Sequence, residues 1–504
     1  MNSNKTLAKN TLFMYIRMLL IMVVTLFTSR IILSELGIED FGLYSLINGV
    51  ILSFTFVNNA LTSTAQRYFA FTIGSKNKTD YNEVYSGCTT LFITSGALLT
   101  LVLIPLGLGL INNKFVIPIE RLEATNWLFL TVCITFFVSF VRISYQSAII
   151  AHEKMNFFAY VGILEALIKL LIVYSLAITP FDKLVTYGVL QLFTTLFFTV
   201  VYYAYVKRYL QTSFHFVFKK DLLKELSSFS GWSLYDGMAS IGKVEFVNFI
   251  INGFYGVVVN AAVGIAKQLN SAINSFTSNF QTAFRPQITK SVASGDNERL
   301  VFLIYNTSKF SGVIFSMVAI PLCVNMKTIL NVWLGNVPEY ADVFAIFFIV
   351  SSGLEALGGA LWITSHAIGN IKYFQIITGT LRLFPIPLVY LYVKYNGMVE
   401  YAFLPLVLSD LLLYLYRVNY VRKKIQINIS GYLLQIGLVL FIDLLVLVAV
   451  LFIYRITHNE IVSLMITTAS SIALMTVLSY WLLLNNYQRS AISTFIKQKF
   501  ANCH

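Results

Sequence analysis

Charged residues are scarce in this sequence: only 12% of its 504 residues are Asp, Glu, Lys or Arg. A soluble globular chain carries about 25%, whereas 57% of this chain is hydrophobic and its mean hydropathy is +0.74. The composition therefore excludes a large soluble core and predicts an integral membrane protein. Cysteine is scarce too, and the four cysteines have neither disulfide nor metal-ligand spacing.

Catalytic motifs are also lacking. The chain has no phosphate-binding P-loop, no zinc-type pair of histidines and no nucleophile elbow, and its five histidines are scattered. We therefore predict no enzyme activity, no metal and no cofactor. Any driving energy would then come from a gradient of H+, Na+ or substrate. A net charge of +13 would suggest nucleic acid in a soluble protein, but the positive-inside rule explains it here, and no nucleic-acid partner is expected.

Long apolar runs are abundant. Fourteen stretches reach the roughly 20 residues that span a bilayer. They lie near 11–33, 42–66, 86–111, 124–150, 156–179, 184–206, 228–253, 258–284, 301–325, 340–366, 371–393, 401–421, 431–454 and 461–485. An even count places both termini on one side of the membrane. The loops on that side carry several times as many Lys and Arg as the opposite loops, which predicts cytoplasmic termini.

Two of these stretches, 219 residues apart, carry polar side chains in matching register. The first stripe comprises Asn48, Thr55, Asn58, Thr62 and Gln66, and the second Lys267, Asn270, Asn274, Thr277, Gln281 and Arg285. At about 100° per residue each stripe falls on one helix face. Gly37 and Gly256 precede the stripes at the same spacing. Because polar groups are costly in lipid, both stripes are expected to face a polar cavity between two parallel repeats.

The predicted fold is an all-α membrane protein of 14 transmembrane helices. It has an N-terminal six-helix lobe (1–206), a cytoplasmic linker (207–227), a C-terminal six-helix lobe (228–424), and two extra helices with a cytoplasmic tail (425–504). The linker mixes basic and aromatic residues, which is typical of a short amphipathic stretch on the membrane surface.

Charges inside the spans indicate the cavity's chemistry, because a charge in a membrane usually faces an interior cavity or a partner. The cations Arg17, Arg142, Lys169, Lys243 and Lys267 suit an anionic head group. The stripe residues Asn48, Thr55, Asn58, Thr62, Gln66, Asn270, Asn274 and Gln281 suit sugar hydroxyls. The carboxylates Glu165, Asp236, Glu245 and Glu355 are candidates for a coupling ion.

Several of these residues have a second interpretation. Glu165 and Lys169, spaced i,i+4, also fit a purely structural ion pair. Arg67 and Arg285 are expected at equivalent cytoplasmic mouths, where they attract the anionic head or simply anchor the helices. His366 could sense pH, but it ends a predicted span and is interpreted as a packing residue.

From Phe229 onward the sequence resembles a known family. The segments Val259-Asn-Ala-Ala-Val-Gly264-Ile-Ala-Lys-Gln-Leu-Asn270 and Pro286-Gln-Ile-Thr-Lys290, followed by Gly295-Asp, are similar to Wzx-type polysaccharide repeat-unit flippases of the multidrug/oligosaccharidyl-lipid/polysaccharide (MOP) exporter superfamily. One departure is Val263, where members of the family often carry Arg.

The resemblance implies a MATE-like fold of two lobes around a central cavity. It also implies a bacterial inner-membrane location and an undecaprenyl-diphosphate-linked oligosaccharide as substrate, released on the periplasmic face for O-antigen (lipopolysaccharide) or capsule synthesis. Membrane lipids and polysaccharide polymerase or assembly proteins would be its partners. A multidrug or organic-cation antiporter of the same fold would need an acidic cavity. A membrane enzyme that polymerises glycans would need a sizeable outward loop, whereas the longest lie near 112–123 and 326–339.

Overall fold

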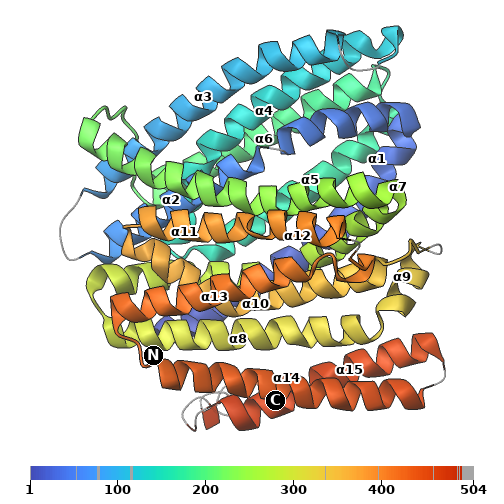
Figure 1. The fold of residues 1–504 in the computed structure, drawn as a ribbon. Helices are drawn as coiled ribbons and strands as arrows, with labels where there is room; N and C mark the ends of the chain where they lie inside the picture. The colour runs from blue at the N-terminus through green and yellow to red at the C-terminus, as the bar shows by residue number, and fades with distance from the viewer. Residues whose placement is uncertain are drawn as a thin grey trace, which may run out of the picture. The chain divides into compact units, whose positions relative to one another are not determined.

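The computed structural model describes residues 2–52, 54–75, 80–113, 117–334, 337–395, 397–457, 459–484, 486 and 489–490. These residues form helices and no strand, which confirms the predicted all-α class (Figure 1). The helices are α1 (Asn2–Leu52), α2 (Thr55–Gly74), α3 (Tyr81–Asn113), α4 (Ile119–Ala151), α5 (Met155–Ser175), α6 (Lys183–Tyr209), α7 (Lys220–Ser294), α8 (Asn297–Val324), α9 (Met326–Leu334), α10 (Ala341–Ile368), α11 (Lys372–Leu383), α12 (Pro385–Lys394), α13 (Leu404–Ile425), α14 (Ile429–Ile456) and α15 (Glu460–Leu478). Short helical turns follow at Leu176–Ile178 (η1), Val399–Tyr401 (η2) and Ser479–Leu483 (η3).

The chain is a multi-pass membrane protein. In the part of the chain that the structure describes, ten helical spans are long and apolar enough to cross a bilayer. They match the predicted stretches three to six and nine to fourteen. The other four predicted stretches fall within α1, α2 and α7. The total of fourteen spans therefore stays a prediction.

The described chain divides into two compact units. Unit 1 comprises Met1–Ile241, Thr282–Asp296 and His366–Gly379, and unit 2 comprises Gly242–Gln281, Asn297–Ser365 and Thr380–His504. Two short pieces from the second half of the sequence thus pack with the first half. The division into two six-helix lobes stays a prediction, because two compact units need not correspond to two repeats of the sequence.

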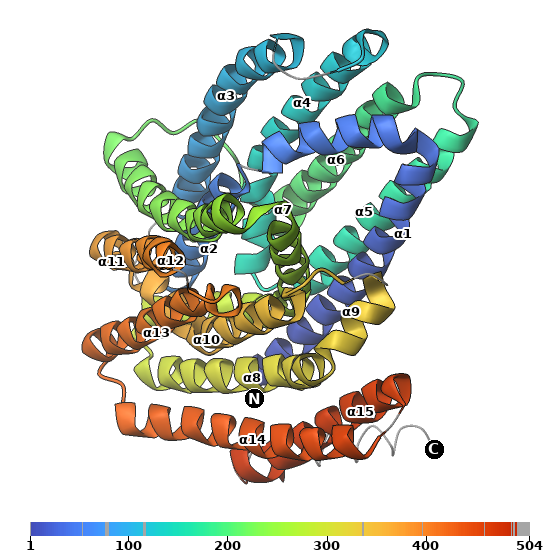
Figure 2. The same cartoon turned by 45° about the vertical axis from the view of Figure 1, so that its right-hand side comes forward.

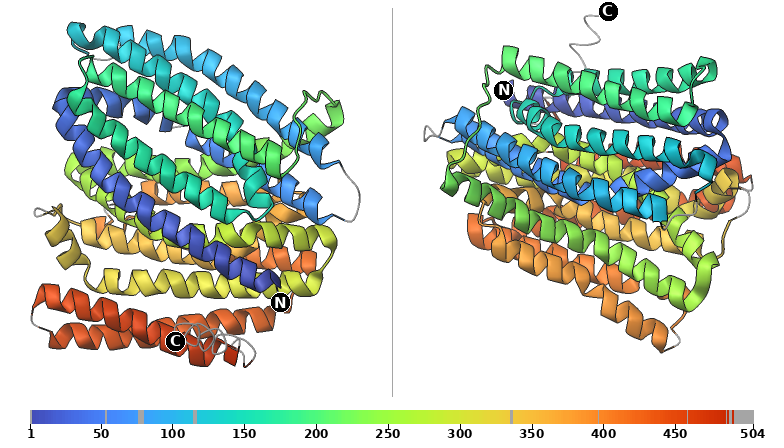
Figure 3. Two further views of the ribbon diagram at one scale, coloured as in Figure 1. Left: turned by 180° about the vertical axis from the view of Figure 1, so that it is seen from behind. Right: turned by 90° about the horizontal axis from the view of Figure 1, so that it is seen from above.

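Unit 1 is built around α4, which packs against α2, α3 and α6 (Figure 1). Its core holds fully buried aromatic side chains from all four helices, namely Phe69, Phe92, Phe140 and Phe198. Seen from behind, α1 runs alongside α5 (Figure 3). This packing leaves α1, α4, α5 and α6 as the walls of the cavity described below.

In unit 2, the hairpin of α14 and α15 packs on α8 through both apolar and polar contacts. Lys309 of α8 donates to the Leu483 carbonyl at 3.1 Å, and Asn325 donates to the Thr467 hydroxyl at 2.9 Å. A buried donor without a partner is costly in an apolar medium. These bonds therefore fix the hairpin to α8 in one register.

Two glycines interrupt the longest helices at equivalent positions. Gly37 has φ 77° and ψ 172°, and Gly256 has φ 80° and ψ −173°. This region of backbone conformation is accessible essentially to glycine alone. Figure 2 shows the resulting change of direction in α1. The register of the repeat predicted that Gly37 and Gly256 are equivalent, and the structure adds a backbone break of the same kind at each of them.

Ion pairs hold the chain on both sides of the Gly37 break. Glu35 accepts a hydrogen bond from Lys183 at 3.0 Å, and Asp40 pairs with Arg121, which also pairs with Asp182. Burial raises the pKa of Asp182, but the Val185 N–H and the Arg121 guanidinium outweigh it, so that this pKa lies below its ordinary value. The break is thus fastened to the starts of α4 and α6.

The glycine break generates a first prediction. Replacing Gly256 by alanine should destabilise the protein by about 1–3 kcal/mol, because an L-residue is strained at this φ and ψ. A lower thermal unfolding temperature of purified protein in detergent would show it. Gly264, in a regular part of α7 with open space around its Cα, is the matched control. There, alanine should be neutral or slightly stabilising. Equal stability of the two variants would contradict the strain argument.

Candidate functional site

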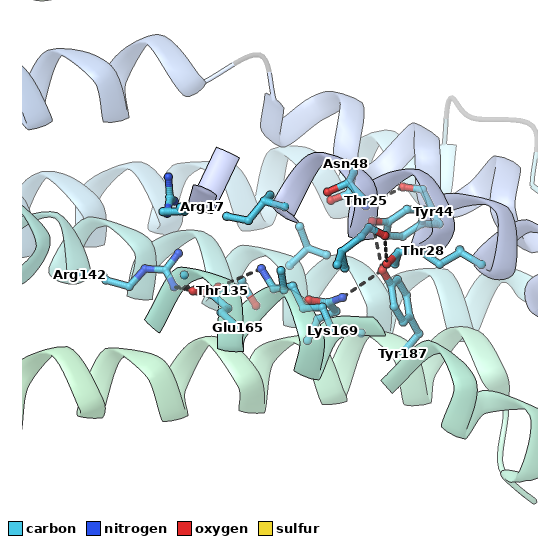
Figure 4. A pocket seen from close by; sticks show the side chains of 18 of the residues that line it. Arg17, Thr25, Thr28, Tyr44, Asn48, Thr135, Arg142, Glu165, Lys169 and Tyr187 are labelled. Atoms are coloured by element: carbon cyan, nitrogen blue, oxygen red, sulfur yellow. Dashed lines mark hydrogen bonds and ion pairs between the residues drawn. The ribbon is translucent and has the colours of Figure 1, made fainter. Parts of the chain in front are cut away.

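A cavity of about 680 Å³ opens inside unit 1, between α1, α4, α5 and α6 (Figure 4). This size is within the range of small-molecule sites, about 300–1,000 Å³. Among the residues that the structure describes, four charged side chains line it: Arg17, Arg142 and Lys169 are cationic and Glu165 is anionic. Three cations against one carboxylate give the lining a formal charge of +2.

Glu165 binds two of these cations. Arg142 Nη1 lies 3.1 and 3.2 Å from its carboxylate oxygens, and Lys169 Nζ lies 2.9 Å from Oε1. The pair expected from the i,i+4 spacing on α5 is therefore present, and Arg142 of α4 extends it. Glu165 is 8% exposed. In Figure 4 the three side chains lie in a row along the cavity.

Arg17 of α1 is the third cation. Its guanidinium lies 4.6 Å from the centre of the Phe158 ring. Its Nε is buried and has no hydrogen-bond partner among the described residues. A Cβ built on Gly162 would lie 2.5 Å from this Nε, so the missing side chain at residue 162 leaves room for the guanidinium. Arg17 thus lines the cavity, while its Nε is buried against Gly162.

The opposite part of the cavity is lined by hydroxyl and amide groups (Figure 4). Gln191 donates to the Tyr187 hydroxyl at 3.0 Å, and the hydroxyls of Tyr187 and Tyr44 are 3.5 Å apart. Asn48 donates to the Tyr44 carbonyl at 3.0 Å. The cavity therefore has a cationic end and a neutral polar end, a pattern that suits a ligand with an anionic head and a hydroxyl-rich body.

Most of the neutral polar residues that line the cavity were not predicted from the sequence. Of the predicted stripe, only Asn48 is among the described residues that line this cavity, and the unforeseen polar lining residues are Thr25, Thr28, Tyr44, Thr135, Gln146, Tyr187, Gln191 and Tyr202. The i,i+4 spacing of Tyr187 and Gln191 within an apolar run is the signal that could have identified two of them.

The first stripe is corrected by a break in the helix. Asn48 lies on α1, whereas Thr55, Asn58, Thr62 and Gln66 lie on α2, which begins at Thr55 after a non-helical Phe54. Counting 100° per residue across 48–66 assumed one continuous helix. That count applies within α2 alone, so a face shared by Asn48 and the α2 residues stays a prediction.

The five predicted cations likewise separate into two groups. Lys243 and Lys267 belong to unit 2, where each has a carboxylate partner. Lys243 Nζ lies 2.8 and 2.9 Å from the carboxylate oxygens of Asp410, and Lys267 Nζ lies 3.0 Å from Glu245 Oε1. The partner of Lys243 could not be read from spacing, because Asp410 is distant in sequence.

The second stripe binds neighbouring helices of unit 2. Ser352 donates to Asn270 Oδ1 at 2.7 Å and accepts from Asn274 Nδ2 at 2.9 Å. Gln281 donates to Ser311 at 3.3 Å and to the Ala356 carbonyl at 3.0 Å. These amides thus connect α7 to α10 and α8. Their predicted contact with sugar stays a prediction.

The remaining predicted residues also have partners. Glu355 accepts from Arg382 at 3.1 Å and from Arg417 at 2.6 Å. In unit 1, Asp236 accepts from Thr378 at 3.0 Å. At the predicted mouths, Arg285 donates to Gln66 at 2.6 Å, and Arg67 lies over the Tyr68 ring at 4.2 Å. Their roles in attracting a head group or an ion stay predictions.

The buried pair in unit 2 generates a second prediction. Lys243 and Asp410 are 6% and 2% exposed. Asp410→Asn should lower the free energy of unfolding by about 3–5 kcal/mol, because it leaves a buried lysine without its counter-charge. Removing both charges with Lys243→Met and Asp410→Leu should recover most of that loss. Thermal unfolding in detergent measures both effects. A double variant no more stable than Asp410→Asn would mean that the charge pair is not the cause.

Comparisons with known proteins identify the fold. No protein-family model and no curated protein matches the sequence. Among solved structures, the chain is similar to an outward-facing multidrug resistance MATE family transporter of the MOP superfamily, with a TM-score of 0.70, 14% identity, and 83% of this chain and 96% of that chain covered. It is also similar to a MATE transporter from Vibrio cholerae (TM-score 0.71, 15% identity, 83% and 97% covered).

A third neighbour is an MOP superfamily transporter from Pyrococcus furiosus, for which a binding pocket of reverse polarity is described as suggesting a different function. Its TM-score is 0.68 at 15% identity, with 83% of this chain and 96% of that chain covered. At such identities the likeness concerns the fold alone. The chain thus has the fold of the MATE transporters of the MOP superfamily.

Proposed function

We propose that the chain is a flippase that moves undecaprenyl-diphosphate-linked oligosaccharide repeat units across the bacterial inner membrane. Movement runs from the cytoplasmic to the periplasmic face by alternating access and serves surface polysaccharide synthesis. The observation that carries this proposal is the cavity of unit 1, whose lining is cationic at one end and rich in hydroxyls and amides at the other.

Each part of this substrate matches one part of the cavity. Arginine binds phosphate oxygens through charge-assisted hydrogen bonds, often in pairs. Arg17, Arg142 and Lys169 would hold the diphosphate, because all three line the cavity. Glu165 keeps Arg142 and Lys169 in position while the cavity is empty. Tyr44, Tyr187 and Gln191 would contact the sugar, since hydroxyl and amide groups both donate and accept.

A multidrug or organic-cation antiporter is the second candidate, because fold neighbours include multidrug MATE transporters. Cationic drugs favour cavities dominated by carboxylates and aromatic rings. The described lining of the cavity in unit 1 has one carboxylate, and two cations already bind it. Its polarity therefore favours the anionic substrate. The Pyrococcus furiosus neighbour supports the use of pocket polarity to distinguish functions within this fold, since its reversed pocket polarity is described as suggesting a different function.

The proposal also covers the topology, the partners and the energy source of the protein. Both termini would be cytoplasmic, membrane lipids would surround the helices, and a polysaccharide polymerase or assembly protein would receive the product. The movement would be driven by an H+ or Na+ gradient or by the substrate gradient, with no further cofactor.

The test is movement of a labelled undecaprenyl-diphosphate oligosaccharide in proteoliposomes that contain the purified chain. Protein-dependent movement is expected, and Arg142→Gln with Lys169→Gln should lower its rate at least about tenfold, equivalent to about 1.4 kcal/mol. The matched control is Arg142→Lys, which keeps the charge. Absence of movement, together with gradient-driven efflux of an organic cation, would favour the antiporter instead.

A further prediction concerns Gly162, because its substitution by alanine changes no charged residue. A methyl group at Gly162→Ala would displace the end of the Arg17 side chain, which is flexible, so stability should change little. Half-maximal movement should then require several times more lipid-linked oligosaccharide, because the guanidinium is no longer in position. The control Gly109→Ala adds a methyl group to α3 in open space. If the two variants need the same substrate concentration, Arg17 does not bind the head group.

A further inference from the structure

The connection between α6 and α7 is an extended segment, residues 210–219, that lies on the beginning of α3 and is called the linker strap below (Figure 1). The His215 backbone N–H donates to the Ser86 hydroxyl at 3.3 Å. Two residues further on, the Val217 N–H donates to the Thr90 hydroxyl, also at 3.3 Å. Two hydroxyl side chains of α3 therefore hold the backbone of the strap in one register along that helix.

These contacts place the linker strap at the level of the membrane surface. With 33 residues, α3 is about 50 Å long at 1.5 Å per residue, whereas the hydrocarbon core of a bilayer is about 30 Å thick. A centred α3 therefore extends roughly 10 Å beyond the core at each end. Ser86 and Thr90 lie about 8 and 14 Å along the helix from its first residue, Tyr81. The predicted apolar stretch also begins at residue 86, so the strap lies where hydrocarbon meets the lipid head groups.

Three phenylalanines form a row of rings on the linker strap. They are alternate residues of an extended segment, which places them on one side of it. The ring centres of Phe214 and Phe216 are 5.0 Å apart, and those of Phe216 and Phe218 are 6.2 Å apart. Phe214 packs against the core of unit 1, but Phe216 and Phe218 are 57% and 72% exposed. Aromatic rings exposed at this level are typical of an anchor in the membrane interface.

Cations lie on both sides of this row of rings. Residues 207–224 include five Lys or Arg against one Asp, which gives the segment a formal charge of +4. One of the five, Lys219, binds Glu83 of α3 at 2.8 Å and so fastens the end of the strap. The other four are exposed and form no ion pair with any residue that the structure describes: Lys207, Arg208, Lys220 and Lys224. Their charge is thus available to an anion at the membrane surface.

We propose that the linker strap and these four cations form an interfacial binding site for anionic phospholipids. Phe216 and Phe218 insert beside the upper part of the acyl chains, and the cations bind the phosphate groups of the lipids around them. The rings set the depth of the strap, because any phospholipid offers them an apolar layer. The cations select the lipid, because only an anionic lipid adds net negative charge at the surface. The site is separate from the transport cavity and does not depend on the transported substrate.

The end of α13 provides a comparison within the same chain. Its last turn carries three exposed cations, Arg422, Lys423 and Lys424. The residues that follow, 425–428, include no aromatic side chain. This triplet therefore offers the charge of an ordinary helix end without a row of exposed rings, and it is the matched control for the cations beside the strap.

The experiment places a fluorescent reporter in the row of rings with Phe216→Trp. The full chain is reconstituted into phosphatidylcholine vesicles with a minor fraction of phosphatidylglycerol. Bromine on the acyl chains quenches a nearby tryptophan, so quenching is measured with brominated phosphatidylglycerol and with the same fraction of brominated phosphatidylcholine. The signal of the unmodified protein, which has five tryptophans, is subtracted. Both lipids should quench the reporter, and phosphatidylglycerol should do so at least about three times as strongly.

Two changes should bring the ratio of the two quenching values to about one: high salt, which screens exposed charges, and the triple variant Lys207→Gln, Arg208→Gln and Lys220→Gln. The control triple variant Arg422→Gln, Lys423→Gln and Lys424→Gln should leave the ratio unchanged. No quenching by either lipid would mean that the strap lies outside the bilayer and overturns the site. A ratio of about one with all cations present, or an equal loss in both triple variants, overturns the selection of anionic lipid by the strap.

Discussion

The arrangement of this protein depends on one constraint: a charged group inside the membrane must find its partner within the protein. Glu165 and Glu355 illustrate two solutions. Glu355 binds Arg382 and Arg417 within unit 2, and in the same unit the Lys243–Asp410 pair is almost fully buried. Glu165 binds Arg142 and Lys169 at the wall of a cavity to which Arg17 adds a further cation. The described lining of the cavity in unit 1 therefore carries more cations than carboxylates.

The break at Gly37 is what brings the two ends of that cavity together. Arg17 and Asn48 both line the cavity, although 31 residues separate them on α1. A straight helix would place them about 46 Å apart, at 1.5 Å per residue. Because the chain changes direction at Gly37, one helix supplies both a cation and an amide to a cavity of about 680 Å³. The ion pairs of Glu35 and Asp40 hold this change of direction in place. The backbone break at Gly37 thus determines that Arg17 and Asn48 line the same cavity.

The sequence predicted features that depend on local spacing and missed those that depend on distant contacts. The 219-residue register predicted the equivalence of Gly37 and Gly256, and the i,i+4 spacing predicted the contact of Glu165 with Lys169. Ten of the fourteen apolar stretches correspond to described membrane-length helices. In contrast, no spacing rule links Lys243 to Asp410 or Asp236 to Thr378, since each pair is joined only by tertiary packing. The stripe across 48–66 is divided between α1 and α2, so counting 100° per residue along one continuous helix does not apply to all of it.

The central claim is that the cations of unit 1 bind the diphosphate of a lipid-linked oligosaccharide. A cryo-electron microscopy map of the purified chain with this ligand tests it most directly. The account predicts diphosphate density within hydrogen-bond distance of Arg17, Arg142 and Lys169, with sugar density towards Tyr44 and Tyr187. Density of the head group against Arg382 and Arg417 of unit 2, with the cavity of unit 1 empty, would contradict it.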